Sequence, residues 1–384
     1  MGEKISLIDP SAEILRMFGL KDLSTSELLE LASRFQLDGT PASAEPFGNG
    51  NVNDTFLLTT VSGHRYTLQR INHDVFKDPV SLMENFARVT SHLAQKHADG
   101  QTTLQTLVLV PSQDGSSYLT GEHGNYWRVT EYVPDGLSLE VPQSREHAYE
   151  AARAFGDFQY QLSDLPGDPL IETIPDFHNT ESRYRAFVHA VEQDVCGRAG
   201  ESAGLISFAK ENEHLAGLIR YADFPTRTVH NDTKLNNVLL HEQTGKGICV
   251  VDLDTAMPGC ALHDFADLVR TAACSSEEDE PDISTIHFLP DRFSALVEGY
   301  LAGVHDMLEP REIEHLAVSP QVITYELSLR FLTDFLQGDT YFKVKRPGHN
   351  FERARAQFQL LRSMQEHASA MEDMVSASLA SGAC

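Results

Sequence analysis

The chain has few of the residues and segments that would place it in several common classes of protein. Its five cysteines are odd in number and form no Cys-x-x-Cys pair, so neither a disulfide framework nor a paired-cysteine metal site is indicated. They are Cys196, Cys249, Cys260, Cys274 and Cys384. No apolar run approaches the ~20 residues of a membrane-spanning helix, and no early stretch resembles a signal peptide. The sequence therefore predicts a cytoplasmic protein with free thiols.

Positive charge is also scarce. Lys and Arg number 30 against 56 Asp and Glu, which gives a formal net charge of -26. Binding to nucleic acid or to an anionic membrane surface depends on cationic patches, so this balance predicts neither kind of partner. Nothing in the sequence specifies an oligomer, and a monomer is the default expectation.

The most informative segment is residues 229–259, VHNDTKLNNVLLHEQTGKGICVVDLDTAMPG. It contains His-x-Asp, an Asn five residues after that Asp, and a short apolar run that ends in a second Asp. This order is typical of phosphoryl transfer from ATP. Asp232 is predicted to accept or orient the proton of the attacking hydroxyl, and Lys234 to place its ammonium near the γ-phosphate. Asn237 and Asp252 would supply the oxygen ligands that Mg²⁺ prefers.

Each of these residues taken alone has an ordinary structural explanation. A single His-x-Asp is usually part of a turn, and Asp-Leu-Asp at the end of a strand is often a helix cap or a loop acid. Four polar positions in register around one apolar run are much harder to obtain by chance. The whole set therefore predicts a kinase site, with Asp254 open as either a second metal ligand or a structural acid.

The order of predicted elements indicates two lobes, which suits a chain of 384 residues. The expected elements are helices at 11–18, 25–32 (opening like a capping box) and 81–96, a loop at 41–50, and strands at 55–61, 65–71, 104–110 and 126–132. The acidic stretch 275–282 is expected to be a solvated loop. We predict an α+β, two-lobed, protein-kinase-like fold, with a small β-rich N-lobe (1–133) and a large, mainly helical C-lobe (134–384).

Residues for the nucleotide are expected in the N-lobe. Arg70 lies on the predicted strand 65–71 and would hold the α/β-phosphates, because its forked guanidinium suits phosphate. Glu84, on the following helix, is the candidate to pair with Arg70, and two separately exposed side chains are the alternative. The segment 127–134 is expected to connect the lobes, with backbone groups of Glu131 and Val133 pairing with the adenine edge.

Five stretches extend this interpretation to a particular family. They lie between residues 48 and 343 and read GNGNVNDTFLL, YTLQRINHDVFKDPVSLMEN, VHNDTKLNNVLL, VVDLDTAMPG and RFLTDFLQGDTYFK. Together they resemble the N-acetylhexosamine 1-kinases, within the aminoglycoside-phosphotransferase-like kinase superfamily. The resemblance implies transfer of the ATP γ-phosphate to the anomeric hydroxyl of N-acetylglucosamine or N-acetylgalactosamine, with Mg²⁺ as cofactor. It also implies that Asp232 is the base, that Asn237 and Asp252 hold Mg²⁺, and that the sugar pocket is lined by Asn51, Asn53, Arg330 and Tyr341.

The acceptor side can also be interpreted from the residues alone. Glu326, Arg330 and Asp334 are four apart, so they lie along one face of a predicted helix, among apolar neighbours. Charges enclosed in this way need partners, which are either each other, as a structural ion-pair ladder, or a ligand rich in hydroxyls. Tyr341 is predicted to hydrogen-bond to or stack against a sugar ring, with core packing as the alternative.

Three functions remain compatible with the sequence, and the first is an N-acetylhexosamine 1-kinase. The second is a kinase of the same fold acting on another small alcohol, such as an aminoglycoside, choline, homoserine or another sugar. A cationic acceptor would call for carboxylates, whereas the sequence offers Arg330 and the basic residues of 343–346. The third is an inactive nucleotide- or sugar-binding module, which the presence of Asp232, Asn237 and Asp252 disfavours. We favour the first.

Overall fold

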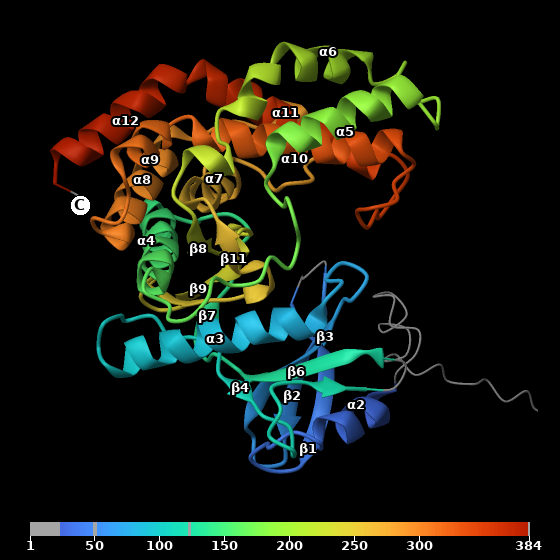
Figure 1. The fold of residues 1–384 in the computed structure, drawn as a ribbon, viewed down its shortest axis with the longest axis vertical. Coiled ribbons are helices and arrows are strands. Elements are labelled where there is room, and N and C mark those ends of the chain that lie inside the picture. Colours follow the sequence, from blue (N-terminus) through green and yellow to red (C-terminus); the bar gives the residue numbers. More distant parts are fainter. Residues whose placement is uncertain (1–23, 49–51, 122–123, 383–384) are drawn as a thin grey trace, which may run out of the picture. The chain divides into compact units, whose positions relative to one another are not determined.

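The chain folds into two compact units. The residues that the computed structural model describes are 24–48, 52–121 and 124–382. Unit 1 comprises Met1–Thr90 and Leu107–Pro134, and unit 2 comprises Ser91–Thr106 and Asp135–Cys384. Unit 1 is built on an antiparallel sheet and unit 2 is mainly helical (Figure 1), which confirms the predicted small β-rich lobe and large helical lobe. Within the described ranges no helix is both long and apolar enough to cross a bilayer.

Unit 1 contains one antiparallel sheet of six strands in the order β1-β2-β3-β6-β4, with β5 also paired to β6. The strands are β1 (Pro41–Pro46), β2 (Asp54–Thr60), β3 (Arg65–Ile71), β4 (Leu109–Val110), β5 (Leu119–Thr120) and β6 (Tyr126–Glu131). Helix α2 (Thr25–Ala32) begins with the expected capping box, formed by Ser24 and Glu27. The predicted helix at 11–18 lies outside the described residues. The predicted strand at 104–110 is reduced to the two residues of β4.

Two helices lie against opposite faces of this sheet. Leu28 of α2 shares an apolar core cluster with Leu68 of β3. Helix α3 (Pro79–Ala98) packs on the other face, where the ring of its Phe86 lies 4.2 Å from the guanidinium carbon of Arg128. Because side chains alternate along a strand, Arg70, two residues after Leu68, lies on the face that α2 covers.

One strand lies where the sequence indicated a loop. Strand β1 occupies most of residues 41–50, and among the described strands it pairs with β2 alone, at the edge of the sheet. Pro41 and Pro46 stand at its two ends. Proline has no N–H to donate, and an edge strand tolerates it because one side of the strand has no partner. A short proline-bounded segment of small residues therefore carries little strand signal.

Unit 2 combines helices with short strands that flank the polar segment 229–259. The strands are β7 (Gly136–Leu137), β8 (Arg227–Val229), β9 (Val238–His241), β10 (Gly247–Val250) and β11 (Met257–Gly259). The α-helices are α4 (Arg145–Leu162), α5 (Thr180–Gln193), α6 (Ala203–Glu211), α7 (Ala261–Ala272), α8 (Pro290–Val304), α9 (Pro310–His315), α10 (Ser319–Leu336), α11 (His349–Glu366) and α12 (Ala368–Ala380). Short 3₁₀ helices are η2 (Glu213–Gly217), η3 (Tyr221–Asp223), η4 (Leu235–Asn237), η5 (Leu253–Thr255) and η6 (Ile283–Thr285).

Helices α4 and α8 pack at very close range because glycine occupies their contact. A Cβ atom at Gly299 would lie 2.1 Å from the carbonyl oxygen of Tyr149, and one at Gly303 would lie 2.3 Å from that of Arg153. These obstacles are main-chain atoms, which cannot turn aside as a flexible side chain does. Helix α4 also contacts β8, β9 and β10. Its packing on α8 therefore helps to hold in place the strands that flank the polar segment 229–259.

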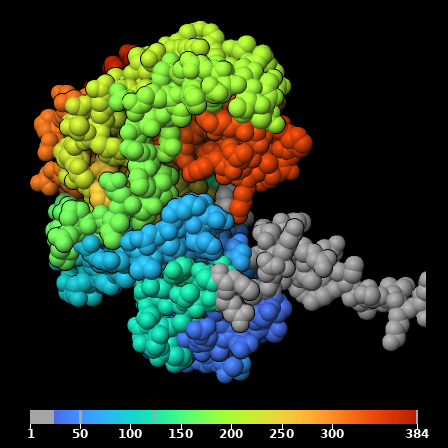
Figure 2. All heavy atoms as spheres, turned by 45° about the vertical axis from the view of Figure 1, so that its right-hand side comes forward, coloured from blue at the N-terminus to red at the C-terminus, as the bar shows by residue number. Residues whose placement is uncertain are grey.

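Helix α10 lies between α5 and α11 in a separate apolar core (Figure 1). The shared cluster includes Phe187, Tyr325, Leu329, Leu332 and Phe358. In the space-filling view the light-green residues of α5 and α6 lie beside the orange-red residues of the α10–α11 segment (Figure 2). The polar side chains of α10 are therefore carried by a helix that is packed on several sides.

Candidate active site

Short antiparallel strands bring the two parts of the polar segment together. Strand β8 pairs with β11, and β9 pairs with β10, where Val238 lies opposite Val250. Beyond the end of β10, the N–H of Val251 donates to the carbonyl of Asn237 at 2.9 Å. The next residue is Asp252. The two predicted metal ligands, Asn237 and Asp252, therefore leave the same hairpin as neighbours.

Asp232 lies in the loop between β8 and η4, with two of the predicted site residues around it. The side-chain Nδ2 of Asn237 donates to the main-chain oxygen of Asp232 at 2.7 Å and to its Oδ2 at 3.1 Å. The Nζ of Lys234 lies 3.4 Å from the same Oδ2, and 29% of the Asp232 side chain remains exposed. Asp232, Lys234 and Asn237 thus form one cluster that a ligand can reach.

The surroundings of Asp232 keep its carboxylate ionised. Burial alone would raise the pKa of Asp232, but the proximity of Lys234 and His230 brings it below its usual value. The pKa of Lys234 is raised in turn, mainly by the charge of Asp232. At neutral pH the pair is therefore a carboxylate that can accept a hydrogen bond from a hydroxyl and an ammonium that stays charged.

Asp252 concentrates negative charge beside this pair. Its backbone is left-handed, with φ 60° and ψ 53°, and burial together with Asp254 and Asp232 raises its pKa to about 6. A divalent cation bound by Asn237 and Asp252 would relieve that repulsion. No three His, Cys, Asp or Glu side chains form a ready-made metal cage in the part of the chain that the structure describes. Mg²⁺ bound together with phosphates does not need one, because one or two carboxylates suffice.

A buried acid that the sequence interpretation missed holds the loop around Asp232. The carboxylate of Asp264, in the first turn of α7, accepts the N–H of His230 at 2.8 Å and the N–H of Asn231 at 2.7 Å. Asn231 has a left-handed backbone with φ 66°, which Asn adopts more readily than most residues. The sequence offered one signal that could have identified Asp264, namely an acidic residue among the apolar residues of ALHDFADLVRTA.

A second layer of hydrogen bonds fixes Asp264 itself. The Nε2 of Gln159, from α4, donates to the Oδ2 of Asp264 at 2.6 Å. The hydroxyl of Tyr300, from α8, donates to the Oε1 of Gln159 at 2.6 Å. The close α4–α8 packing is thus connected by side chains to the two peptide bonds on either side of His230.

A buried ion pair reaches the same loop from another direction. The Nδ1 of His178 lies 2.9 Å from the Oε1 of Glu326, and its Nε2 lies 2.9 Å from the carbonyl oxygen of Asn231. The hydroxyl of Thr180 donates to the other carboxylate oxygen of Glu326 at 2.7 Å. His178, which precedes α5, was not among the residues singled out from the sequence.

The predicted charged stripe of α10 does not form an ion-pair ladder. Glu326 pairs with His178, while Asp334 accepts the main-chain N–H groups of the loop that follows α10. Arg330 lies between them and has no hydrogen bond or ion pair with any residue in the described ranges. Its guanidinium carbon lies 5.3, 5.9 and 5.5 Å from three aromatic ring centroids, those of Phe177, Tyr341 and Phe342.

Tyr341 is available to a ligand and is not part of the core. Its side chain is 62% exposed, which rules out the alternative of core packing. Its N–H donates to Asp334 at 2.8 Å, and its ring meets that of Phe342 edge-on, with centroids 4.8 Å apart. The loop after α10 therefore presents Tyr341 in a fixed place near Arg330.

The predicted pairing of Arg70 with Glu84 is wrong in this structure. Arg70 binds Asp54 instead, with its Nε at 2.8 Å and a terminal nitrogen at 2.6 Å from Oδ2, while Glu84 is exposed. The cause is strand alternation, which turns Arg70 to the α2 face of the sheet and away from α3. On the α3 face, Arg128 is buried and donates to Gln69 at 2.9 Å.

The remaining unit 1 residues show mixed outcomes. The N–H of Glu131 is taken by the carbonyl of Val108 at 2.9 Å, so only its carbonyl side stays a candidate for adenine. The N–H of Val133 has no hydrogen-bond acceptor within the described residues. Asn53 is buried and its Oδ1 accepts the N–H of Asn72 at 3.0 Å, a contact within unit 1. Asn51 lies outside the described residues.

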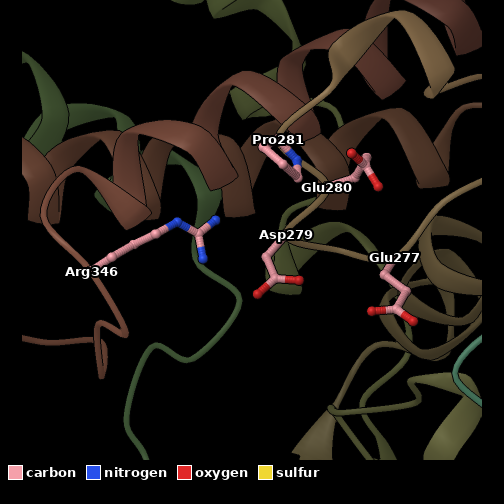
Figure 3. A pocket seen from close by; sticks show the side chains of 5 residues that line it. All are labelled: Glu277, Asp279, Glu280, Pro281 and Arg346. Atoms are coloured by element: carbon pink, nitrogen blue, oxygen red, sulfur yellow. The ribbon is translucent and has the colours of Figure 1, made fainter.

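The acidic stretch expected to be a solvated loop is partly anchored. Glu278 forms an ion pair of 2.7 Å with the buried Arg270 of α7. Its neighbours line a cavity of about 340 Å³ together with Arg346 (Figure 3): they are Glu277, Asp279, Glu280 and Pro281. The basic residues after α10 are largely neutralised here, because Lys345 lies 3.3 Å from Asp279 and Arg346 pairs with Glu352.

Comparisons with solved structures bear out the fold. An aminoglycoside phosphotransferase from Alicyclobacillus acidocaldarius superposes with a TM-score of 0.58 at 16% identity, covering 90% of this chain and 95% of the other. The microcompartment-associated aminopropanol kinase gives a TM-score of 0.56 at 14% identity, with coverage of 91% and 99%. The amicoumacin kinase hAmiN in complex with AMP-PNP, Ca²⁺ and Ami gives 0.55 at 12% identity, with coverage of 91% and 96%.

A family model settles the wider relationship. The APH model, described as the phosphotransferase enzyme family, matches residues 43–296. The match includes most of the sheet of unit 1 and the whole polar segment 229–259, and it extends over more than half of the chain. Because this match extends over more than half of the 384 residues, the chain belongs to the phosphotransferase enzyme family.

Proposed function

We propose that the protein is an ATP-dependent kinase that phosphorylates the anomeric hydroxyl of N-acetylhexosamines to give the sugar 1-phosphate. The observation that carries the kinase chemistry is the cluster in which Asp232 lies 3.4 Å from Lys234 and accepts the Asn237 amide. Phosphoryl transfer asks mainly for positioning and charge stabilisation. An ionised carboxylate next to a permanent ammonium provides both.

Each residue of the cluster has a definite task in this proposal. Asp232 accepts the hydrogen bond of the acceptor hydroxyl and aims its oxygen at the γ-phosphate. Lys234 stabilises the charge that develops on the transferred phosphoryl group. Asn237 holds Asp232 by two hydrogen bonds, so the carboxylate does not have to be ordered during the reaction.

Mg²⁺ would be held by Asn237 and Asp252, and when bound it neutralises charge on the phosphates of ATP. The residues fit this ion because they are hard oxygen donors, and because the negative charges of Asp254 and Asp232 add to the effect of burial in raising the pKa of Asp252. Asp254 lies beside Asp252 and adds to the same excess. We assign Asp254 no more specific part.

The acceptor side favours a neutral, hydroxyl-rich molecule. Arg330 forms no ion pair or hydrogen bond with the described residues, and the exposed ring of Tyr341 is close to it. A sugar offers both an apolar ring face for stacking and oxygens for charge-assisted hydrogen bonds. Arg183 lies close enough to Arg330 for the two positive charges to lower the pKa of Arg183, after the larger effect of burial. Two neighbouring guanidiniums disfavour a cationic acceptor.

The choice of an N-acetylhexosamine rests on the resemblance of the five sequence stretches, and especially on RFLTDFLQGDTYFK. In the structure this stretch is the end of α10 and the loop after it, so it contributes both Arg330 and Tyr341. Structural relatives named for aminoglycosides, aminopropanol and amicoumacin support the coarser statement that the acceptor is a small alcohol.

The deciding experiment is ADP production with Mg-ATP over a panel of acceptors. The panel holds N-acetylglucosamine, N-acetylgalactosamine, glucose, galactose, kanamycin, choline and 1-amino-2-propanol, with Asp232→Asn as the blank. Turnover confined to the two N-acetylated sugars is the expected result. Turnover on another member would keep the kinase mechanism and discard the assignment of the acceptor. Turnover equal to that of the Asp232→Asn blank with every acceptor would overturn the proposal.

A further inference from the structure

His178 connects two parts of unit 2 that are far apart in the sequence. It precedes α5, it is buried, and it lies between Glu326 of α10 and the catalytic loop. Both ring nitrogens are 2.9 Å from an oxygen: Nδ1 from Glu326 Oε1 and Nε2 from the Asn231 carbonyl. The imidazole ring of His178 thus connects α10 to the loop that carries Asp232.

The partners of His178 determine its protonation state. A peptide carbonyl only accepts hydrogen bonds, and an ionised carboxylate also only accepts. Burial favours the neutral form of His178, but the charge of Glu326 outweighs it and the pKa of His178 is raised. The pKa of Glu326 falls to about 2 because His178, and to a smaller extent Arg330, overcome the effect of burial. His178 therefore donates from both nitrogens as an imidazolium.

Other groups that face the ring are consistent with this charge. The hydroxyl of Tyr221, from η3, accepts the main-chain N–H of His178 at 3.3 Å. The ring of His263, from α7, lies 5.0 Å away, and burial together with the charge of His178 lowers its pKa to about 3. Asp267, also on α7, adds negative charge nearby. The imidazole of His263 is therefore neutral, and the negative charge closest to His178 is that of Glu326.

The bond to Asn231 bears directly on Asp232. The carbonyl that His178 holds belongs to the peptide bond between Asn231 and Asp232, and the N–H of Asn231 is held by Asp264 at 2.7 Å. With both main-chain groups fixed, Asn231 is kept in its left-handed conformation, which most residues avoid. The direction in which the Asp232 side chain leaves the loop depends on this peptide.

We propose that His178 is a positioning residue for phosphoryl transfer: as an imidazolium held by Glu326, it fixes the Asn231–Asp232 peptide and so aims the Asp232 carboxylate. Glu326 lies one helical turn before Arg330, so the same helix carries the anchor of His178 and the proposed acceptor contact. This inference rests on the proposed kinase function for its catalytic readout and on the geometry of unit 2 for the rest.

The test compares two variants that differ only in the bridge. Glu326→Gln keeps it, because the Gln amide donates to the Nδ1 of a neutral His178, which still donates from Nε2 to Asn231. Glu326→Gln combined with His178→Leu removes it without leaving a buried unpaired charge, which would unfold the protein. Thermal melting of both variants shows that they are folded before their kinetics are compared.

We expect Glu326→Gln to keep kcat within about threefold of the wild type. The double variant should lose about 10- to 100-fold in kcat, with KM for ATP within about twofold, because a small misplacement of a catalytic group costs this much. A purely structural role would change the melting temperature and leave the kcat of the folded enzyme unchanged. A double variant whose kcat equals that of Glu326→Gln would overturn the proposal.

Two readouts separate this inference from the proposed sugar substrate. Hydrolysis of ATP by water, without any acceptor, also depends on Asp232, so the same ratio between the variants is expected there even if every sugar fails. Side-chain ¹⁵N–¹H spectra of ¹⁵N-histidine protein are expected to show both His178 nitrogens protonated at pH 7.5, with the signal assigned by its loss in the double variant. A neutral ring in the wild type would contradict the imidazolium directly.

Discussion

The side-chain amide of Asn237 donates to Asp232 at two places, the main-chain oxygen at 2.7 Å and the carboxylate Oδ2 at 3.1 Å. The five-residue spacing between them was visible in the sequence, but not the reason for it. One turn of 3₁₀ helix, η4, brings residue 237 back over residue 232. The Asn237 amide therefore orients the proposed base, while its oxygen remains available to a metal ion.

Asp232→Asn should reduce kcat by about 10²- to 10⁴-fold, because an amide cannot take the place of the ionised carboxylate as hydrogen-bond acceptor and base. The dissociation constant of Mg-ATP should change little, since the proposed Mg²⁺ ligands are untouched. Steady-state kinetics and nucleotide binding by calorimetry measure the two quantities. Asp373→Asn, an exposed position on α12, is the matched control. Substantial turnover by Asp232→Asn would remove Asp232 from the role of base.

Asp252→Asn should raise the Mg²⁺ concentration needed for half-maximal activity at least about tenfold, because an amide is a weaker ligand for a hard cation than a carboxylate. Titration of activity with Mg²⁺ at fixed ATP measures this. The matched control is Asp306→Asn, which changes an exposed acid just after the end of α8. The same titration on this variant should reproduce the wild-type curve. An unchanged curve for Asp252→Asn would show that the metal is bound elsewhere.

Arg330→Ala should lower kcat/KM for the acceptor by about 10- to 100-fold, since a charge-assisted hydrogen bond contributes roughly 1.5–3 kcal/mol. KM for ATP should stay within about twofold. Arg185→Ala, which removes an exposed arginine of α5, controls for loss of charge. If ATP and acceptor suffer equally in Arg330→Ala, Arg330 has a structural role and the acceptor pocket must be sought elsewhere.

Gly299→Ala should destabilise the protein by about 1–3 kcal/mol or more, because its Cβ would lie 2.1 Å from the carbonyl oxygen of Tyr149. Gly204→Ala, in α6, is the matched control: no atom lies within 4 Å of its Cβ, so alanine should be neutral or stabilising there. Urea unfolding of both variants gives the two free energies. Equal stability of the two would mean that α4 and α8 separate easily.

The buried pair of His178 and Glu326 should make stability fall in acid. The pKa of Glu326 is depressed from 4.5 in a free side chain to about 2, so its contribution is complete above pH 4.5 and is lost as the pH falls toward 2. The pKa of His178 is raised, so its contribution is complete below pH 6.5 and is lost as the pH rises through its folded value.

Unfolding free energies measured between pH 2 and 5 test the acid limb. The wild type should lose more stability across this range than the double variant Glu326→Gln/His178→Leu, in which neither residue of the pair titrates. Parallel curves for the two proteins would show that Glu326 is not the group responsible.

Local pattern was enough to predict that Asp232, Lys234 and Asn237 come together, since all three lie within residues 229–259, in the short segment between the paired strand β8 and the β9–β10 hairpin. The strands at 55–61 and 65–71 and the helix at 81–96 were confirmed for the same reason: their periodicity is visible in a window of a few residues. Strand alternation places Tyr66, Leu68 and Arg70 on one face of β3, and this follows from the local sequence alone. Which helix covers that face is a tertiary property, and this is where the pairing with Glu84 failed.

The supporting residues could not have been found in this way. His178 is 53 residues from Asn231 and 148 from Glu326, and Gln159 is 105 from Asp264. A buried His or Gln has no periodic signature, and its partners are determined by how helices pack. Such residues lie in positions that a hydrophobic pattern assigns simply to a core, so their hydrogen bonds appear only in three dimensions.

The spacing of Glu326 and Arg330 on α10 limits how the protein can be engineered. A library aimed at a new acceptor would naturally randomise the inner face of that helix, and it would then disturb the anchor of His178 together with the pocket. Variants altered only at Phe177, Tyr341 and Phe342 change the wall around Arg330 and leave Glu326 in place. Selection for altered acceptor preference should therefore enrich changes at these three aromatic positions and discard those changes at 326 that break the bond to His178.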